Sequence, residues 1–209
     1  IVNDSETGEG LKAWYGQLCK RPCFHDEYLQ SFNNASTHLV HTDGKGVERI
    51  TEKGVVFDGE EFPVDCIIFA SGFEVGTPLQ RRTGFDPKGK SRKKLSDHWS
   101  DGMRTFHGLQ IADFPNSFIV QATQGANLIS NYPSNLGDSA KTIASIIAHM
   151  LKTESRVVEV KTEAEEKWVQ LIMAGPGAML GSQDCTPGYY NNEGIDPGPP
   201  RKSFAGYPF

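Results

Sequence analysis

The sequence has no long hydrophobic run and little cysteine, and both shortages narrow what the chain can be. Nowhere do about 18 consecutive apolar residues occur, so no membrane-spanning segment is expected. The first residues, IVNDSETGEG, lack the basic start and apolar stretch of a secretion signal. Four cysteines in 209 residues are too few for a disulfide scaffold. We therefore expect a cytoplasmic chain whose cysteines are reduced.

Several motifs that carry chemistry are also missing. No Gly-x-Gly-x-x-Gly follows a predicted strand, and GPGAMLG at 175–181 follows a helix with the wrong spacing. Cys19, Cys23 and His25 have no fourth zinc ligand at a suitable spacing. No Gly-x-Ser-x-Gly elbow is present. The sequence therefore predicts neither a self-contained hydrolase nor a metal site.

The charge of the chain excludes one further class of partner. The formal net charge is -5, which gives no reason to expect nucleic acid or an anionic membrane as a partner. Any cluster of cations must act locally. One such cluster is the adjacent pair Lys20 and Arg21, in QLCKRPCFHDEYL, and another is the basic stretch within 76–104, which we interpret as solvated surface.

Residues 47–69 carry sequence patterns that are typical of strands. Residues 47–57 predict two strands joined by a turn at 52–54, and Asp58-Gly59 predicts a second hairpin turn. The stretch Val64–Phe69 is apolar at nearly every position, as in a strand covered on both faces of a parallel sheet. We expect it to be central in a sheet.

The second half predicts a strand followed by two helices. Ser117–Ala122 is a buried-type strand, and 133–151 carries apolar residues at helical spacing. Thr162 begins a second helix with a Thr-Glu-Ala-Glu capping box and places Trp168 on an apolar face. This order is typical of a doubly wound α/β sheet, in which ligands lie at the carboxyl ends of the strands. The loops after the two predicted strands, ASGF at 70–73 and ATQGANLISNY at 122–132, are thus candidate ligand loops, although ASGF is equally well a plain tight turn.

Four stretches together resemble a known family. They are CKRPCFHDEYLQSFN, GVVFDGEEFPVDCIIFASGFEVGT, HWSDGMRTFHGLQIADFPNSFIVQATQGANLISNYPSNL and DCTPGYYNNEG. In this order they resemble the C-terminal portion of type I Baeyer–Villiger monooxygenases over nearly the whole chain. The last stretch is similar to the branch that accepts bulky, polycyclic or steroid-like ketones.

The resemblance implies a fold, a reaction and partners. The fold is α/β, the C-terminal part of a flavoprotein with two dinucleotide-binding domains: residues 1–67 end the NADPH-binding domain and 68–209 belong to the FAD-binding domain. The implied reaction inserts one oxygen atom of O2 beside a ketone carbonyl to give an ester or lactone, using FAD and NADPH. The family's FAD fingerprint, its Phe-x-Gly signature and its active-site aspartate are not in this sequence. The missing N-terminal portion, on the same or a separate chain, is therefore an implied partner.

The resemblance also assigns roles to individual residues. The family's arginine beside the anionic flavin peroxide falls on Arg21, and arginine suits this role because it stays protonated and offers several donors. Lys20 is similar to a lysine that contacts NADP. The remaining residues match either the family's two flavin loops or its ketone pocket. They are Ala70, Ser71, Gly72, Phe73, Ser130, Asn131 and Tyr132 for the cofactor, and Leu128 and Ile129 for the substrate. In the first flavin loop, ASGF, Ser71 replaces the family's threonine.

Two other functions stay open at this point. A flavin monooxygenase that oxidises nitrogen or sulfur shares the fold but has no need of Arg21. A non-catalytic half-domain that only binds another chain would present an unpaired apolar sheet edge.

Overall fold

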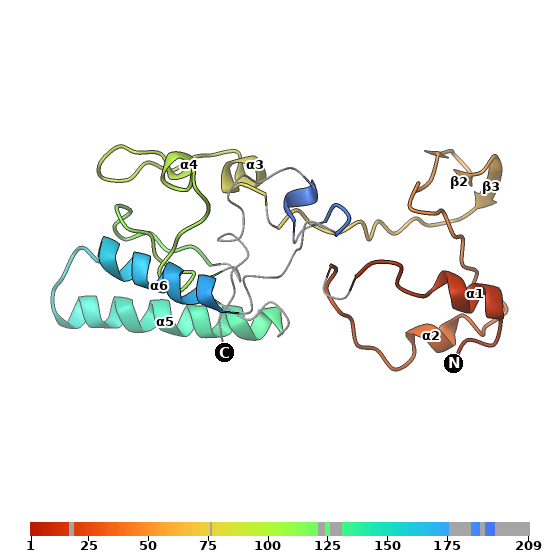
Figure 1. Ribbon diagram of the computed structural model, residues 1–209, viewed down its shortest axis with the longest axis horizontal. Coiled ribbons are helices and arrows are strands. Elements are labelled where there is room, and N and C mark those ends of the chain that lie inside the picture. Colours follow the sequence, from red (N-terminus) through yellow and green to blue (C-terminus); the bar gives the residue numbers. More distant parts are fainter. Residues whose placement is uncertain are drawn as a thin grey trace. The chain divides into compact units, whose positions relative to one another are not determined.

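The computed structural model describes residues 1–16, 19–75, 77–120, 124–125, 131–175, 185–188 and 191–194 (Figure 1). The chain divides into two compact units. Unit 1 contains Ile1–Trp14 and Cys23–Phe73, and unit 2 contains Tyr15–Pro22 and Glu74–Phe209. The short segment Tyr15–Pro22 thus belongs to unit 2, although its neighbours in sequence on both sides belong to unit 1. The assignment of 1–67 and 68–209 to the two cofactor domains stays a prediction.

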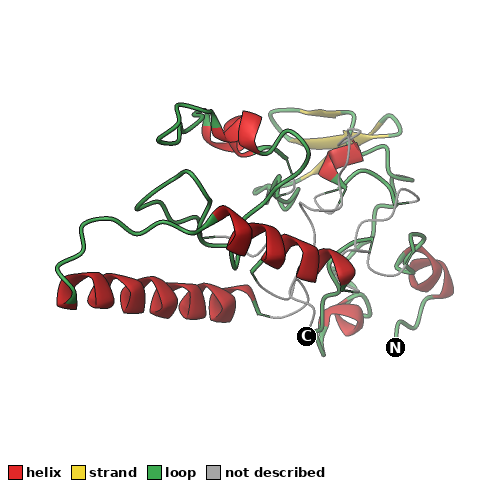
Figure 2. Ribbon diagram, turned by 60° about the vertical axis from the view of Figure 1, so that its left-hand side comes forward, coloured by secondary structure: helices red, strands yellow, loops and turns green. Residues whose placement is uncertain are grey.

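Unit 1 contains two short helices and a small sheet. The helices are α1 (Ser5–Gly10) and α2 (Tyr28–Ser31). The strands β1 (Arg49–Ile50), β2 (Gly54–Phe57) and β3 (Glu60–Pro63) pair antiparallel in chain order, as the yellow arrows in Figure 2 show. Both residues of the turn after β2 are left-handed, Asp58 with φ 49° and Gly59 with φ 76°, as a type I′ turn requires. The two predicted hairpin turns are therefore confirmed.

The β2–β3 hairpin depends on the absence of a side chain at Gly54. Gly54 pairs with Pro63, and a Cβ there would overlap the backbone carbonyl of Phe62. We expect Gly54→Ala to destabilise the protein by about 2 kcal/mol, measured by urea unfolding, because backbone must move to make room. Gly137→Ala is the control: it lies inside a helix with open space around it, so it should raise stability by about 1 kcal/mol. Equal effects of the two changes would contradict this account of the hairpin.

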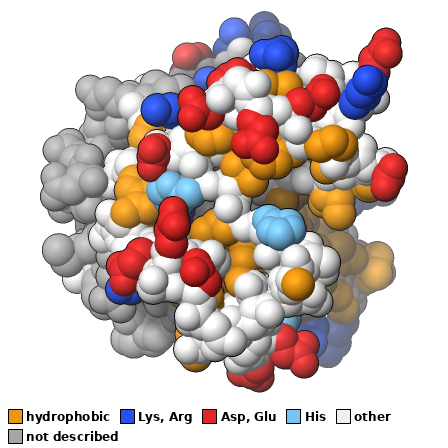
Figure 3. All heavy atoms as spheres, turned by 90° about the vertical axis from the view of Figure 1, so that its right-hand side faces the viewer, with side chains coloured by type: hydrophobic (Ala, Val, Ile, Leu, Met, Phe, Trp, Pro, Cys, Tyr) orange, Lys and Arg blue, Asp and Glu red, His pale blue; other side chains and the backbone are white. Residues whose placement is uncertain are grey.

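Two predicted strands are not observed. Val64–Phe69 is neither helix nor strand, and its Ile68 and Phe69 side chains are 85% and 76% exposed. Ser117–Val120 forms no strand either, and residues 121–122 lie outside the described residues. A strand exists only when a neighbour satisfies its backbone groups, and no other described strand pairs with these segments. On the face shown in Figure 3, hydrophobic side chains are exposed among Asp and Glu side chains.

Unit 2 is helical where it has regular structure. Its elements are α3 (Leu79–Thr83), α4 (Leu95–His98), α5 (Tyr132–Lys152), α6 (Thr162–Ala174) and the 3-10 turn η2 (Asn192–Gly194). In Figure 1, α5 and α6 run in opposite directions and are joined by a loop. The two long helices predicted from sequence are confirmed. None of the α5 side chains is buried, so the apolar face predicted for this helix is not covered by the described residues.

The core of unit 2 consists of two small clusters. In the first, Trp168 and Ile172 of α6 pack with Phe106, which confirms Trp168 as a core residue. The second contains the buried residues Leu95, Ile111 and Phe114. Apolar packing of this kind fixes α4 and α6 within the unit.

The beginning of α6 differs from its prediction in one respect. The helix starts at Thr162 as expected, but Lys161 is the N-cap residue and makes no side-chain cap bond. Glu165, which would complete the capping box, is instead buried and accepts a hydrogen bond from Ala112 N at 3.0 Å. The predicted capping box is therefore wrong because tertiary contacts use its glutamate.

The described helices include none that is both long and apolar enough to cross a membrane.

Candidate functional site

The adjacent cations Lys20 and Arg21 lie in unit 2, on the segment Tyr15–Pro22. Both side chains are partly buried. The Lys20 ammonium lies 5.4 Å from the centroid of the Tyr15 ring, a cation–π distance. Within the described residues no carboxylate forms an ion pair with Lys20. Its charge is thus available to an anionic ligand.

A disulfide joins this segment to the other end of the chain. Cys19, next to Lys20, is bonded to Cys185, 166 residues away in sequence. The expectation that all cysteines are reduced is therefore wrong for these two, whereas Cys23 and Cys66 are exposed and form no disulfide. Sequence spacing gave no signal for a bridge of this separation, because only the fold brings the two ends of the chain together.

The residues after Cys185 form a compact loop. The Asn191 side-chain amide donates to Cys185 O at 2.9 Å and to Thr186 O at 3.0 Å, and its Oδ1 accepts from Gly188 N at 2.9 Å. A further bond runs from Glu193 N to Gly188 O at 2.9 Å. One asparagine thereby holds three backbone groups, so the described parts of 185–194 have a defined shape. We call them the Cys185 loop.

The start of α5 carries two of the predicted cofactor residues. Asn131 is the N-cap, and its side chain accepts from Ser134 N at 3.3 Å. Its carbonyl accepts from Asn135 N at 3.3 Å, and Pro133 has no N–H. The N–H groups of Ser134 and Asn135 in this first turn are therefore used within the helix. The positive end of the helix dipole remains, and the exposed Tyr132 lies at that end.

The loop ASGF is exposed, and the cluster that follows it is tightly bonded. Ala70–Phe73 belongs to unit 1 and has no regular structure. Glu74, in unit 2, accepts from Arg81 at 2.6 and 2.8 Å and from Thr77 Oγ1 at 2.8 Å. The hydrogen bonds from Arg81, then that from Thr77, lower the pKa of Glu74. Arg82 donates to Thr77 O, and burial lowers its pKa. Side chains of the basic stretch thus bond to other groups of the chain, Arg81 to Glu74 and Lys90 to Glu159 at 2.6 Å, in keeping with a structural surface.

Several predicted residues lie outside the described residues. They are Leu128, Ile129 and Ser130. The sequence before them is anchored in unit 2. Gln124 is fully buried with φ 63°; its Oε1 accepts from Thr105 Oγ1 at 2.7 Å, and its backbone O accepts from Trp168 Nε1 at 2.8 Å. Sequence reasoning missed Gln124, since a lone glutamine in a loop carries no pattern.

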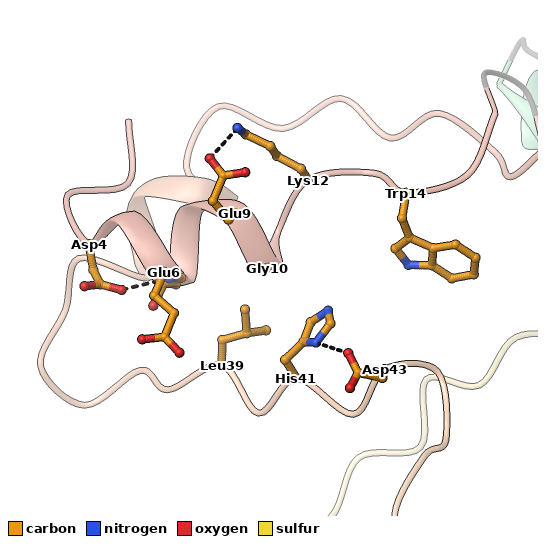
Figure 4. Close-up of a pocket in the computed structure, with 10 residues that line it drawn as sticks. Asp4, Glu6, Glu9, Gly10, Lys12, Trp14, Leu39, His41 and Asp43 are labelled. Carbon is orange, nitrogen blue, oxygen red and sulfur yellow. Dashed lines mark hydrogen bonds and ion pairs between the residues drawn. The ribbon is translucent and has the colours of Figure 1, made fainter.

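Unit 1 has a pocket of its own, which Figure 4 shows in close-up. It has a volume of about 710 Å³ and lies between α1 with its flanks and the segment 39–43. Its carboxylates are Asp4, Glu6, Glu9 and Asp43, against one lysine, Lys12. A hydrogen bond from Thr7 N lowers the pKa of Asp4. A pocket with this excess of negative charge repels phosphate groups, so it is a poor candidate for a dinucleotide.

In the described parts of the chain, no group of three or more His, Cys, Asp or Glu side chains is arranged to hold a metal ion.

Curated proteins that match the chain include Baeyer–Villiger monooxygenases. It is 45% identical to the neopentalenolactone D synthase of Streptomyces avermitilis over 197 residues, which cover 93% of this chain and 33% of that protein. It is 39% identical to the Baeyer–Villiger monooxygenase ATR8 of Stachybotrys chlorohalonatus, over 93% of this chain and 31% of that protein. The chain therefore spans about a third of the length of the curated relatives it matches. No protein-family model matches it.

Solved structures give the same result. The polycyclic ketone monooxygenase of Thermothelomyces thermophila matches with a TM-score of 0.74 and 36% identity, over 99% of this chain and 33% of that one. The cyclohexanone monooxygenase of Rhodococcus sp. Phi1, bound to NADP+, matches with a TM-score of 0.66 and 29% identity, over 83% of this chain and 32% of that one. These matches confirm the predicted fold class, part of an α/β flavoprotein with two dinucleotide-binding domains. The chain is therefore homologous to the Baeyer–Villiger monooxygenases and corresponds to about a third of such an enzyme.

Proposed function

We propose that this chain is the C-terminal part of an FAD- and NADPH-dependent Baeyer–Villiger monooxygenase, which inserts one oxygen atom of O2 beside a ketone carbonyl. The observation that carries the proposal is the Lys20–Arg21 pair. Both cations lie in the same compact unit as the start of α5, where the helix dipole is positive. Two cations and a helix start suit the anionic phosphates and reduced ring of a flavin or nicotinamide dinucleotide.

Different residues of the chain have different proposed roles in the reaction. FAD, when bound, supplies the oxygen chemistry, with electrons from NADPH. Arg21 offsets the negative charge that develops on the ketone oxygen as the carbonyl carbon becomes tetrahedral, and it does so without reorientation because its charge is fixed. Lys20 binds a ribose or phosphate of NADP. Ala70, Ser71, Gly72, Phe73, Ser130, Asn131 and Tyr132 contact the flavin, and Leu128 and Ile129 line the ketone pocket.

We further propose that the substrate is a bulky ketone. The polycyclic ketone monooxygenase matches 99% of the chain, whereas the cyclohexanone monooxygenase matches 83%. The additional matched length favours the polycyclic branch. Paired assays with a fused-ring ketone and with cyclohexanone, each followed by product analysis, test this: a clear preference for cyclohexanone would contradict it.

The compartment we propose is the cytoplasm. Thiols are kept reduced there, and disulfides that do occur in it are mostly transient or redox-sensing. The Cys19–Cys185 bond would then belong to this labile class rather than to the permanent disulfides of secreted domains.

The missing portion is the proposed partner, and adding it tests the function. Since the chain spans about a third of its relatives, we expect purified chain alone to bind no FAD. Chain combined with the missing N-terminal portion, as one polypeptide or two, should be yellow and should convert ketone to ester or lactone with NADPH. The flavin absorbance spectrum and product analysis are the two measurements.

The same samples separate the alternatives. FAD binding with oxidation of amines or sulfides but no ester would favour a nitrogen- or sulfur-oxidising enzyme. A stable complex of the two portions without FAD would favour a half-domain that only binds its partner. Either result would reject the proposed function.

A further inference from the structure

We propose that the Cys19–Cys185 disulfide is a redox-sensitive clasp that positions the Lys20–Arg21 pair, so that its reduction weakens oxygen transfer to the ketone. The effect on oxygen transfer rests on the proposed function. The clasp itself rests on contacts among described residues and can be tested without any enzyme assay.

One end of the clasp lies directly beside the cations. Cys19 is 7% exposed, and its N–H donates to Gly16 O at 3.1 Å. The segment Tyr15–Pro22 belongs to unit 2, but the chain before and after it belongs to unit 1. Its neighbours in sequence therefore do not fix it in unit 2. The disulfide is a covalent link that does.

The other end of the clasp is a loop with a defined shape. Asn191 bonds to the carbonyls of Cys185 and Thr186 and to the N–H of Gly188. Gly194 N donates to Asn191 O at 3.0 Å. These bonds define the shape of the Cys185 loop. The disulfide therefore ties Cys19 to a loop of defined conformation.

Lys20 also reaches this loop. A Cβ added at Gly188 would lie 3.9 Å from Lys20 Nζ, so the ammonium group lies close to the loop backbone. The ammonium also lies 5.4 Å from the centroid of the Tyr15 ring. The lysine head group is thus close both to its own segment and to the Cys185 loop. Cutting the disulfide removes the covalent limit on how far these two can separate, and with it the fixed place of Lys20 and Arg21.

Reduction of the clasp is ordinary thiol–disulfide exchange. Cys185 is partly exposed, so a small dithiol can reach its sulfur. A dithiothreitol thiolate attacks Cys185 Sγ, the S–S bond breaks, and Cys19 leaves as a thiolate that takes up a proton. The second dithiothreitol thiol then displaces Cys185 as a thiol. Two electrons pass to the cysteines, and dithiothreitol is left as its cyclic disulfide.

The first test follows the bond and the loop. The complete enzyme is purified without reductant, digested, and searched by mass spectrometry for the Cys19–Cys185 cross-link, with Cys23 and Cys66 as free thiols. Hydrogen exchange is then measured before and after dithiothreitol. We expect roughly tenfold faster exchange at the amides of Gly188, Glu193 and Gly194, which the loop now protects, and no change in the β2–β3 hairpin.

The second test follows the reaction. We expect reduction to lower the ester formed per NADPH oxidised by roughly tenfold, because small misplacements of a catalytic group have effects of this size or larger. Cys19→Ser and Cys185→Ser should show the same low ratio and no response to dithiothreitol. Cys23→Ser, which removes an exposed cysteine that forms no disulfide, four positions after Cys19, is the matched control and should behave as wild type.

The outcomes separate the two proposals. Faster exchange on reduction, with no ester from any sample, would support the clasp and reject the function. Free Cys19 and Cys185 thiols in the unreduced enzyme would overturn the clasp. So would a cross-link whose reduction changes neither the exchange rates nor the product ratio.

Discussion

Replacing Arg21 by alanine in the complete enzyme is expected to leave NADPH oxidation in place while slowing ester formation by roughly 100-fold or more. The reducing equivalents should then appear as hydrogen peroxide. Arg21 lies beside Lys20 in a segment that a disulfide holds in unit 2. Arg21 is proposed to stabilise negative charge that develops only during oxygen transfer. Its removal should therefore slow oxygen transfer and leave the reduction of the cofactor unchanged.

Two further variants distinguish a fixed charge from a general loss of structure. Arg21→Lys keeps the positive charge but loses the planar group with its several donors, so we expect partial activity. Arg156→Ala removes an exposed arginine of unit 2 and should be close to wild type. The measurements are NADPH consumption, ester and peroxide on the same sample. Undiminished ester formation by Arg21→Ala would remove this residue from the active site.

The roles of Lys20 and Arg21 come from family resemblance and stay a prediction. The structure places the pair in the unit that contains α5. The disulfide beside it was not predicted. A contact across 166 residues depends on the whole fold, and neither spacing nor local propensity carries a signal for it.

The turns and helices that depend on residues close together in sequence are predicted correctly. Asp58-Gly59 specifies its turn by backbone conformation alone, and α5 follows from apolar spacing with Asn131 and Pro133 at its start. Val64–Phe69 has a pattern that requires strands on both sides. The apolar pattern predicts neighbouring strands, but no described strand pairs with this segment. The chain spans about a third of the length of its relatives.

The capping box shows how a local pattern can be overridden. Thr162 and Glu165 have the spacing of reciprocal caps, yet Glu165 turns into the unit. Its Oε1 accepts from Ala112 N, and its Oε2 lies 3.4 Å from His98 Nε2 and 3.7 Å from Arg104 Nε. A buried N–H, the Arg104 guanidinium and the His98 imidazole all lie against this carboxylate, and together they outweigh a cap bond worth about 1 kcal/mol.

Glu165→Ala should therefore destabilise the protein by about 3 to 5 kcal/mol, read from the urea midpoint of unfolding. The side chain is 2% exposed. Its removal leaves the Ala112 N–H without its acceptor and the Arg104 guanidinium without one of its carboxylates, and water does not readily replace either partner in a buried site. Arg104 keeps its bond to Glu166, which limits the loss on that side.

Two matched variants show which part of Glu165 matters. Glu165→Gln keeps an oxygen for Ala112 N and removes only the charge, so a loss of about 1 to 2 kcal/mol is expected. Glu163→Ala removes an exposed carboxylate from the same first turn of α6 and should cost well under about 1 kcal/mol. If Glu165→Ala were no worse than Glu163→Ala, the buried carboxylate would not be holding α6 to the loop at Ala112. The helix would then depend on its other contacts, such as the packing of Trp168 and Ile172.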